Sequence, residues 1–327
     1  MKIDFLTTST NDPYLNLAYE EELLNMAQDE GRAFFMLWQN KNTVVIGKNQ
    51  NPWRECNVDA LKNDGITIAR RITGGGAVYH DMGNLNFSFI FPDKSWDKAR
   101  DFHIILEALS GFGINGEVTG RNDMVAEGKK FSGNAYANKR DAFLHHGTLL
   151  VSSDMSVFPK YLSPSREKLK AKGVKSVSSR IINLCEISAD ITVEKLIAAL
   201  FDSAKKLIGE PLFTGDAKDV TDKTKIEAIY RRNMSWEYLM GTTPTFEIEL
   251  TKRFDWGEVA LMLNVEHGVI SSCAVYSDAL LTQIISQGNT VLKGVRYLPE
   301  DVYNAWIPYA TSEEERQIVK DIASLIV

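Results

Sequence analysis

Strand-like segments follow one another along the first 150 residues of this 327-residue chain, with few helices between them. Residues 33–38 and 43–47 are rich in β-branched and aromatic side chains, which favour strands. Four polar residues, 39–42, separate these two segments, so we expect an antiparallel hairpin. Residues 84–91 alternate apolar and polar side chains, which is the period of a half-buried strand. This clustering favours an α+β domain with a mixed or antiparallel sheet over a doubly wound parallel sheet.

Apolar periodicity and capping residues predict three helices in the first 210 residues. The first follows Asp12 and Pro13 and reaches about Asp29, the second covers residues 95–110, and the third covers residues 193–208. A second hairpin is expected over residues 130–152, with its turn near 138–141.

The C-terminal part of the chain has its own pattern of strands and helices. Three strand-like segments lie near 245–252, 258–266 and 269–276, and helical periodicity follows them to the end of the chain. Domains hold roughly 100 to 200 residues, so a chain of this length should form about two. We expect a catalytic domain at residues 1–243 and a small α+β accessory domain at residues 244–327.

Charge and cysteine content exclude several classes of protein. The 37 basic and 43 acidic residues give a net charge of −6, which argues against a broad nucleic-acid-binding surface. No segment approaches the roughly 18 uncharged apolar residues of a membrane span, and no secretory leader is evident, so a cytoplasmic protein without a membrane partner is expected. The three cysteines, Cys56, Cys185 and Cys273, are far apart and contain no Cys-x-x-Cys pair, which predicts reduced thiols.

Three consecutive glycines, Gly74, Gly75 and Gly76, follow a strand that ends in two arginines. Glycine here carries an entropy cost, so the chain should need free φ angles or a close approach of backbone N–H groups. Successive N–H groups bind anions, and Arg71 offers a planar partner for phosphate oxygens. The segment is neither a Walker A loop nor a Gly-x-Gly-x-x-Gly turn. The alternative is a flexible hairpin loop beside surface arginines.

A second candidate cluster lies between residues 120 and 136. Asp123 could help to hold Mg²⁺ on a triphosphate, because magnesium takes one or two carboxylates and lets phosphates fill the rest of its shell. Lys130 would be the cation at the reacting centre, although a lysine near a glycine turn is often only solvated. The basic segment 160–180 is a solvated surface, a docking surface for an acidic partner, or a mobile lid drawn to a bound anion.

His145 and His146 are neighbours on an expected strand and therefore point to opposite faces, so they cannot readily chelate one metal ion. We expect one of them to be buried and hydrogen-bonded while the other faces the pocket. Cys185 could be a nucleophile, although a lone cysteine is more commonly an inert buried thiol.

Several ordered blocks of the chain resemble the lipoate-protein ligase family, and they cover most of the first 240 residues. The blocks are Gln50-Asn51-Pro52-Trp53, Arg70-Arg71 with Gly74-Gly75-Gly76-Ala77-Val78-Tyr79-His80-Asp81, Gly120-Arg121-Asn122-Asp123, Lys130-Phe131-Ser132-Gly133, His145-His146-Gly147-Thr148-Leu149-Leu150, Lys172-Gly173, Ser176-Val177, Ser179-Arg180 and Ser235-Trp236-Glu237.

The resemblance implies a catalytic domain akin to biotin ligases and class II aminoacyl-tRNA synthetases. The implied reaction converts lipoate and Mg-ATP to lipoyl-adenylate, and the lipoyl group then passes to a lysine of an acceptor protein. That acceptor would be a lipoyl domain of a 2-oxoacid dehydrogenase complex or a glycine-cleavage H-type protein.

The resemblance also implies which residues meet the ligands. Lys130 is the expected catalytic residue, and Lys130, Arg71 and His146 are expected at the lipoate. The magnesium candidate is Asp123. The residues expected at ATP or the adenylate are Arg71, Gly74, Gly75, Gly76, Ala77, Val78, Tyr79, Asp123 and Lys130.

The lipoyl tail needs a narrow apolar slot, for which the candidates are Phe35, Leu37, Val44 and Leu149.

A rival function is a cysteine-dependent octanoyl or lipoyl transferase of the same superfamily, which would use Cys185 and no ATP. A non-enzymatic acyl-adenylate sensor is disfavoured, because the N-terminus enters a strand directly and leaves no room for a helix-turn-helix module. Biotin ligation is disfavoured because the loop lacks the extra arginines expected in that relative.

Overall fold

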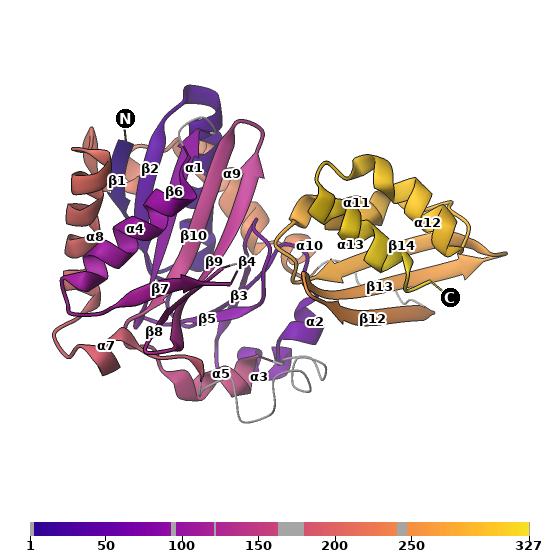
Figure 1. Cartoon of the computed structure of the whole chain (residues 1–327), viewed down its shortest axis with the longest axis horizontal. Helices are drawn as coiled ribbons and strands as arrows, with labels where there is room; N and C mark the ends of the chain where they lie inside the picture. Colours follow the sequence, from indigo (N-terminus) through magenta and orange to yellow (C-terminus); the bar gives the residue numbers. More distant parts are fainter. Residues whose placement is uncertain (1–2, 93–95, 121, 163–179, 241–246, 327) are drawn as a thin grey trace.

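The computed structural model describes residues 3–92, 96–120, 122–162, 180–240 and 247–326. It has the α+β architecture that the sequence predicts, with a larger N-terminal part and a smaller C-terminal part (Figure 1). The larger part contains an eight-stranded mixed sheet in the order β11-β1-β2-β6-β10-β9-β8-β7. Strand β1 is parallel to both of its neighbours, and all other pairs in this sheet are antiparallel. The strands are β1 (Ile3–Thr7), β2 (Ala33–Trp38), β6 (Asn84–Pro92), β7 (Gly116–Thr119), β8 (Asp123–Ala126), β9 (Lys129–Lys139), β10 (Ala142–Leu150) and β11 (Phe213–Asp216).

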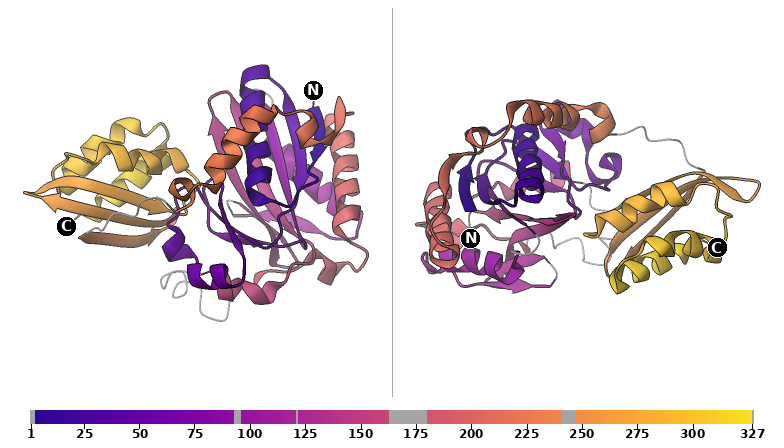
Figure 2. Two further views of the ribbon diagram at one scale, coloured as in Figure 1. Left: turned by 180° about the vertical axis from the view of Figure 1, so that it is seen from behind. Right: turned by 90° about the horizontal axis from the view of Figure 1, so that it is seen from above.

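Helices cover both faces of this sheet (Figure 2). Helices α1 (Pro13–Glu30) and α9 (Lys223–Met234) pack on one face, whereas α4 (Lys98–Ser110) and α8 (Val193–Ile208) pack on the other. The alternation of β2 divides the core between them: Phe35 joins the cluster under α4 and α8, and Phe34 joins the cluster under α1. Shorter elements are α2 (Pro52–Glu55), α3 (Val58–Asn63), η2 (Met155–Val157), α5 (Phe158–Tyr161), α7 (Leu184–Ile187), η4 (Ala217–Asp219) and α10 (Trp236–Leu239).

The predicted helices form close to their expected bounds. The Asp12 carboxylate accepts the backbone N–H groups of Tyr14 and Leu15 and so caps α1, which ends at Gly31 with a left-handed φ of 67°. The second helix begins at Lys98, capped by Asp97, and the expected start at residue 95 lies outside the described residues. The hairpin of β9 and β10 also forms as predicted.

Two expectations about strands are wrong. Strand β2 does not pair with β3 (Thr43–Ile46), which instead forms a small sheet with β4 (Thr67–Arg70) and β5 (Val78–His80). The polar connection between them is not a free turn, because Asn40 is fully buried and hydrogen-bonded within the fold. Strand β6 is buried on both faces, because its polar side meets a buried polar layer in which Ser88 donates to Glu20.

The C-terminal part is an antiparallel three-stranded sheet with helices on one face (Figure 1). Its apolar core includes Leu261, Ile284, Trp306 and Ile318. The expected domain boundary near residue 243 lies outside the described residues and stays a prediction, as does the role of residues 163–179. Among the described helices, none is both long and apolar enough to cross a membrane. The elements of this part are β12 (Ile248–Phe254), β13 (Gly257–Glu266), β14 (Val269–Ser277), α11 (Thr282–Val291), α12 (Pro299–Trp306), η5 (Ile307–Tyr309) and α13 (Glu313–Ala323).

Candidate active site

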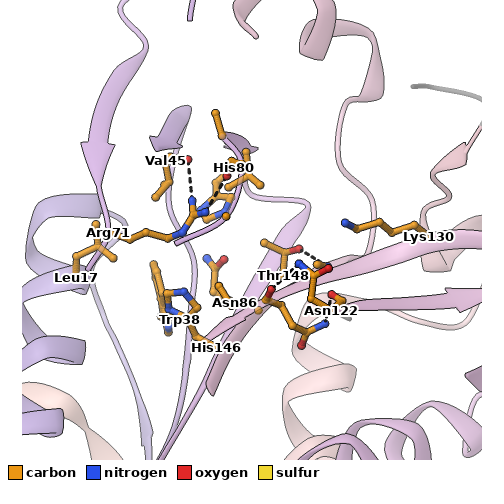
Figure 3. A pocket seen from close by; sticks show the side chains of 18 residues that line it. Leu17, Trp38, Val45, Arg71, His80, Asn86, Asn122, Lys130, His146 and Thr148 are labelled. Atoms are coloured by element: carbon orange, nitrogen blue, oxygen red, sulfur yellow. Dashed lines mark hydrogen bonds between the residues drawn. The ribbon is translucent and has the colours of Figure 1, made fainter. Parts of the chain in front are cut away.

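A cavity of about 190 Å³ brings together the two clusters that the sequence singled out. Arg71, from the loop after β4, and Lys130, from β9, both line it (Figure 3). The loop that contains Gly74, Gly75 and Gly76, called the glycine loop below, and the β9–β10 hairpin supply most of its wall. The lining residues are Leu17, Trp38, Val45, Arg71, Gly75, Gly76, Ala77, Val78, His80, Asn86, Asn122, Lys130, Gly133, Asn134, Ala135, His146, Gly147 and Thr148.

Arg71 is only 6% exposed and is held by its own loop. Its guanidinium donates to the carbonyl oxygens of Val45 at 3.1 Å, Gly74 at 2.7 Å and Gly76 at 2.8 Å. Burial lowers the pKa of Arg71 to about 10, which leaves it cationic at neutral pH. The side chain therefore shapes the glycine loop and brings positive charge to the cavity. Its direct contact with phosphate stays a prediction.

The three glycines have different surroundings. A Cβ at Gly74 would lie 2.1 Å from the carbonyl oxygen of Ala279, so only glycine fits there. Gly75 has a φ of 93° and donates its N–H to the same oxygen at 3.4 Å, whereas a Cβ at Gly76 would meet nothing within 4 Å. The C-terminal part of the chain thus rests on the glycine loop.

Of the next residues, Ala77 and Val78 line the cavity and Tyr79 does not. The Tyr79 ring stacks on Tyr161 at 5.6 Å in a separate core cluster. A ligand contact from Tyr79 would therefore have to come from its main chain.

A β-bulge sets the direction of Lys130. The register between β8 and β9 shifts so that Met124 faces Ser132 and Val125 faces Lys130, which leaves Phe131 as the extra residue. Phe131 is buried in the core, whereas the Lys130 side chain is 35% exposed. A Cβ at Gly133 would lie only 3.0 Å from the Lys130 Nζ, so this glycine makes room for the lysine.

Asp123 begins β8 and forms an ion pair with Lys130, with 2.6 Å between its Oδ1 and the lysine Nζ. Its side chain is 40% exposed, and it is not among the described residues that line the cavity, although its partner Lys130 is. Among the described residues, no group of three or more His, Cys, Asp or Glu side chains could hold a metal ion by itself. A single accessible carboxylate fits Mg²⁺ that arrives bound to a nucleotide, because the phosphates then supply the other ligands.

A buried polar network that sequence patterns did not predict lies behind the cavity. His146 lines the cavity, and its Nδ1 lies 2.8 Å from Glu20 of α1 while its Nε2 lies 2.7 Å from the Thr73 hydroxyl. Thr73 in turn accepts a hydrogen bond from Arg71 at 3.1 Å. Glu20 gave a signal in the sequence, since it falls on the apolar stripe that Leu17 and Leu24 define.

His80 lines the same cavity, and its buried neighbours fix its protonation. Asn16 donates to Asn40 Oδ1, so the Asn40 amide must donate to Nδ1 of His80, which leaves the histidine proton on Nε2. Burial, with Arg71 and His146 nearby, lowers the pKa of His80 to about 3, so the ring is neutral. Its Nε2 is buried without a hydrogen-bond partner among the described residues.

Sequence comparison identifies the family. The model of the lipoyl protein ligase A/B catalytic domain matches residues 12–205, and that of the bacterial lipoate protein ligase C-terminus matches residues 243–326. A lipoate-protein ligase A of Psychrobacter cryohalolentis is 38% identical over 309 residues, which are 92% of this chain and 91% of the relative. The chain belongs to the lipoyl protein ligase family.

Solved structures of lipoyl protein ligases share the fold. LipL1 of P. falciparum, solved in complex with lipoate, is 30% identical with a TM-score of 0.86, over 99% of this chain and 98% of that chain. A lipoate-protein ligase A bound with ATP is 25% identical with a TM-score of 0.61, over 74% of this chain and 99% of that chain.

In this family member, the residues expected to line an apolar slot for the lipoyl tail lie away from the cavity. Phe35, Leu37, Val44 and Leu149 are fully or almost fully buried in the apolar core and do not line the cavity. Their neighbours Trp38 and Val45 line it instead, together with Leu17 of α1. Successive side chains of a strand point to opposite faces, and the sequence did not show which face was which.

The histidine pair takes the expected arrangement, with one histidine away from the cavity and the other lining it. Both histidines are buried and hydrogen-bonded, and His146 is the one that lines the cavity. Cys185 lies on α7 and packs against the core, and it is not among the described residues that line the cavity. This position gives no support to the rival cysteine-dependent transfer.

Proposed function

We propose that the protein is an ATP-dependent lipoate-protein ligase that works through an acyl-adenylate. In the first step, the lipoate carboxylate attacks the α-phosphorus of ATP, a mixed anhydride forms and pyrophosphate leaves. In the second step, a neutral lysine amine of the acceptor attacks the acyl carbon, an amide forms and AMP leaves. The family assignment and the lipoate-bound and ATP-bound relatives support this reaction.

One observation carries the proposal: the glycine loop held by Arg71 and the amine of Lys130 line a single cavity. A carboxylate and a phosphate repel each other, so the protein must position both anions and neutralise their charge. The cavity supplies positive charge from Arg71 and Lys130 at its polar side. Apolar walls at Leu17, Trp38 and Val45 suit an alkyl tail.

We assign Lys130 to charge neutralisation in both steps. Its Nζ now pairs with Asp123, and a phosphate or carboxylate that entered the cavity would compete for it. Lys130 would then stabilise the negative charge that develops on the acyl oxygen during transfer. Arg71 and His146 would line the lipoate site, and the backbone of residues 74–79 would face the nucleotide.

Asp123 is the residue that we propose to bind Mg²⁺. Bound magnesium would neutralise charge on the phosphates of ATP and favour departure of pyrophosphate. Asp123 would supply one carboxylate oxygen once its ion pair with Lys130 opens. The physiological acceptor is a further proposal: a lipoyl domain of a 2-oxoacid dehydrogenase complex or a glycine-cleavage H-type protein.

The decisive assay measures ATP-dependent pyrophosphate release with lipoate, octanoate and biotin in parallel, with and without a lipoyl domain or an H-type protein. We expect release with lipoate, little with biotin, and acyl transfer only when an acceptor is present. In the same assay, Cys185→Ala should leave ligation unchanged. Activity that needs no ATP and disappears in Cys185→Ala would favour the transferase instead.

The first prediction concerns Lys130. We expect Lys130→Ala to lower the rate of adenylate formation by roughly 100-fold or more, the order lost with one oxyanion-stabilising donor. Lys129→Ala is the matched control, because Lys129 is exposed and does not line the cavity. Pyrophosphate release near the wild-type rate in Lys130→Ala would contradict the role.

A further inference from the structure

The first histidine of the pair, His145, belongs to β10 and faces away from the cavity. It is fully buried between α4, β6 and β9, and it is not among the residues that line the cavity. Its Nδ1 lies 3.1 Å from Asp101 Oδ2, and its Nε2 lies 2.9 Å from Asn134 Oδ1. Asp101 is itself fully buried on α4. A buried carboxylate and imidazole in contact need a reason beyond apolar packing, because burying polar groups costs free energy.

The surroundings of Asn134 fix where the histidine protons lie. The Asn134 Nδ2 is 3.1 Å from the backbone carbonyl oxygen of Asn122, which can only accept a hydrogen bond. The Asn134 Oδ1 must therefore face His145 and accept from it, so His145 carries a proton on Nε2. The remaining proton is shared between His145 Nδ1 and Asp101, whose Oδ2 also accepts from Trp96 at 3.2 Å.

Hydrogen bonds from Asn134 connect His145 to Asn122, which lines the cavity. Its backbone N–H donates to the Asn122 carbonyl at 2.8 Å, and the Asn122 Nδ2 donates to the Asn134 carbonyl at 2.9 Å. Together with the side-chain bond, three hydrogen bonds clamp the turn at Asn122 to β9. Asn122 lines the cavity, and the next residue is Asp123, which pairs with Lys130 at 2.6 Å.

We propose that Asp101 and His145 are positioning residues for adenylate formation: they orient the Asn134 amide, which holds Asn122 and Asp123 beside Lys130. This inference rests on the proposed function, because it assigns the clamped turn to the nucleotide side of the cavity. Neither Asp101 nor His145 touches a reacting atom. Their effect on the cavity passes through the side-chain amide of Asn134. Its Oδ1 must face His145 and its Nδ2 must face the Asn122 carbonyl oxygen.

Two substitutions separate positioning from simple packing. Gln at position 145 keeps an amide N–H that can donate to Asn134, whereas Leu fills similar space and has no donor. We expect His145→Leu to raise the KM for ATP or lower kcat for pyrophosphate release by roughly tenfold or more, the order seen when a supporting hydrogen bond behind a site is lost. The KM for lipoate should change less than about threefold, since the contacts that line the lipoate cavity stay in place.

His145→Gln should recover part of the lost activity, because it keeps a donor to Asn134, and the activity still missing should reflect the contact with Asp101 that both variants lose. The matched control is His103→Leu, because His103 is exposed on α4 and has no part in this chain of contacts. Equal losses of activity in the Leu and Gln variants, in step with equal losses of thermal stability, would show a packing role and overturn the proposal.

A readout without substrate keeps the two proposals distinguishable. In full-length protein labelled with ¹⁵N-histidine, the His145 resonances are those absent from His145→Gln, and the wild-type ring should show a protonated Nε2. An unprotonated Nε2 would overturn the inference even if ligation works. Absence of lipoate-dependent pyrophosphate release in the wild type would overturn the ligase proposal, and with it the assignment to adenylate formation, but not the hydrogen-bond order. Should His145→Leu fail to fold, the Gln variant and the ring protonation still decide.

Discussion

The buried histidines show how neighbours set the chemistry of a single residue. His146 and His145 each contact a carboxylate from a helix, Glu20 of α1 on one face of the sheet and Asp101 of α4 on the other. Within the described part of the chain, His80 has no carboxylate partner, and the positive charge of Arg71 helps to lower its pKa. The three buried imidazoles therefore have different environments: His146 and His80 line the cavity, and His145 lies away from it.

His80 gives a prediction for the pH dependence of stability. Its pKa of about 3 in the folded protein lies below the usual value of 6.5, so the unfolded chain binds one more proton between these limits. Stability should therefore be fully present above pH 6.5 and fall as the pH drops towards 3, by about 1.4 kcal/mol per pH unit for this proton.

The measurement is the free energy of unfolding by urea at several pH values between 3 and 6.5. His80→Gln removes the titrating group and should show a shallower slope than the wild type. Identical slopes in the two proteins would mean that His80 is not the group that titrates.

At the scale of elements, strand β9 connects core and cavity through its bulge. The bulge places its extra residue, Phe131, in the core while Lys130 stays accessible, and glycines at 133 and 147 keep the strands close. A Cβ at Gly133 would meet only the end of the Lys130 side chain, whereas a Cβ at Gly147 would lie 2.6 Å from the Phe87 ring and 2.8 Å from a backbone oxygen.

These two glycines predict opposite phenotypes. Gly133→Ala should displace Lys130 and lower the rate of adenylate formation by roughly tenfold or more, with little loss of stability, because a flexible side chain can move but its reach changes. Gly147→Ala should cost about 1–3 kcal/mol of unfolding free energy, since the core must rearrange. Urea denaturation and pyrophosphate release on both variants provide the check, and a stability loss confined to Gly133→Ala would contradict it.

At the scale of the whole molecule, the C-terminal part meets the catalytic part beside the cavity. Ser277 donates its N–H to the Asn49 carbonyl at 2.8 Å, and the Asn49 side chain donates to the Thr282 carbonyl at 3.0 Å. Arg70 binds α10, donating to the carbonyl oxygen of Tyr238 at 2.8 Å, and it also donates to the carbonyl oxygen of Gln50 at 2.8 Å. The two neighbouring arginines thus have separate tasks, since Arg71 holds the glycine loop and Arg70 holds α10 against the segment near Gln50.

A substitution at Gly74 tests the contact between the glycine loop and the C-terminal part. Gly74→Ala should push the C-terminal part away, because the new Cβ would lie 2.1 Å from the Ala279 carbonyl oxygen. Small-angle X-ray scattering should then report a larger radius of gyration than for the wild type. Gly76→Ala is the control, since its Cβ would meet nothing within 4 Å. A radius unchanged in Gly74→Ala would show that the loop yields instead.

Sequence patterns alone predict the fold class, the helices α1, α4 and α8, the β9–β10 hairpin, the C-terminal strands, and the clusters around Arg71 and Lys130. These features depend on local periodicity, caps and motifs, which neighbouring residues encode. The folded structure was needed to show that β2 and β3 enter different sheets, which strand faces line the cavity, and that Glu20, Thr73 and Asp101 form buried hydrogen bonds with the histidine pair. Strand pairing and buried hydrogen bonds join residues far apart in the chain, and their geometry exists only once the core has formed.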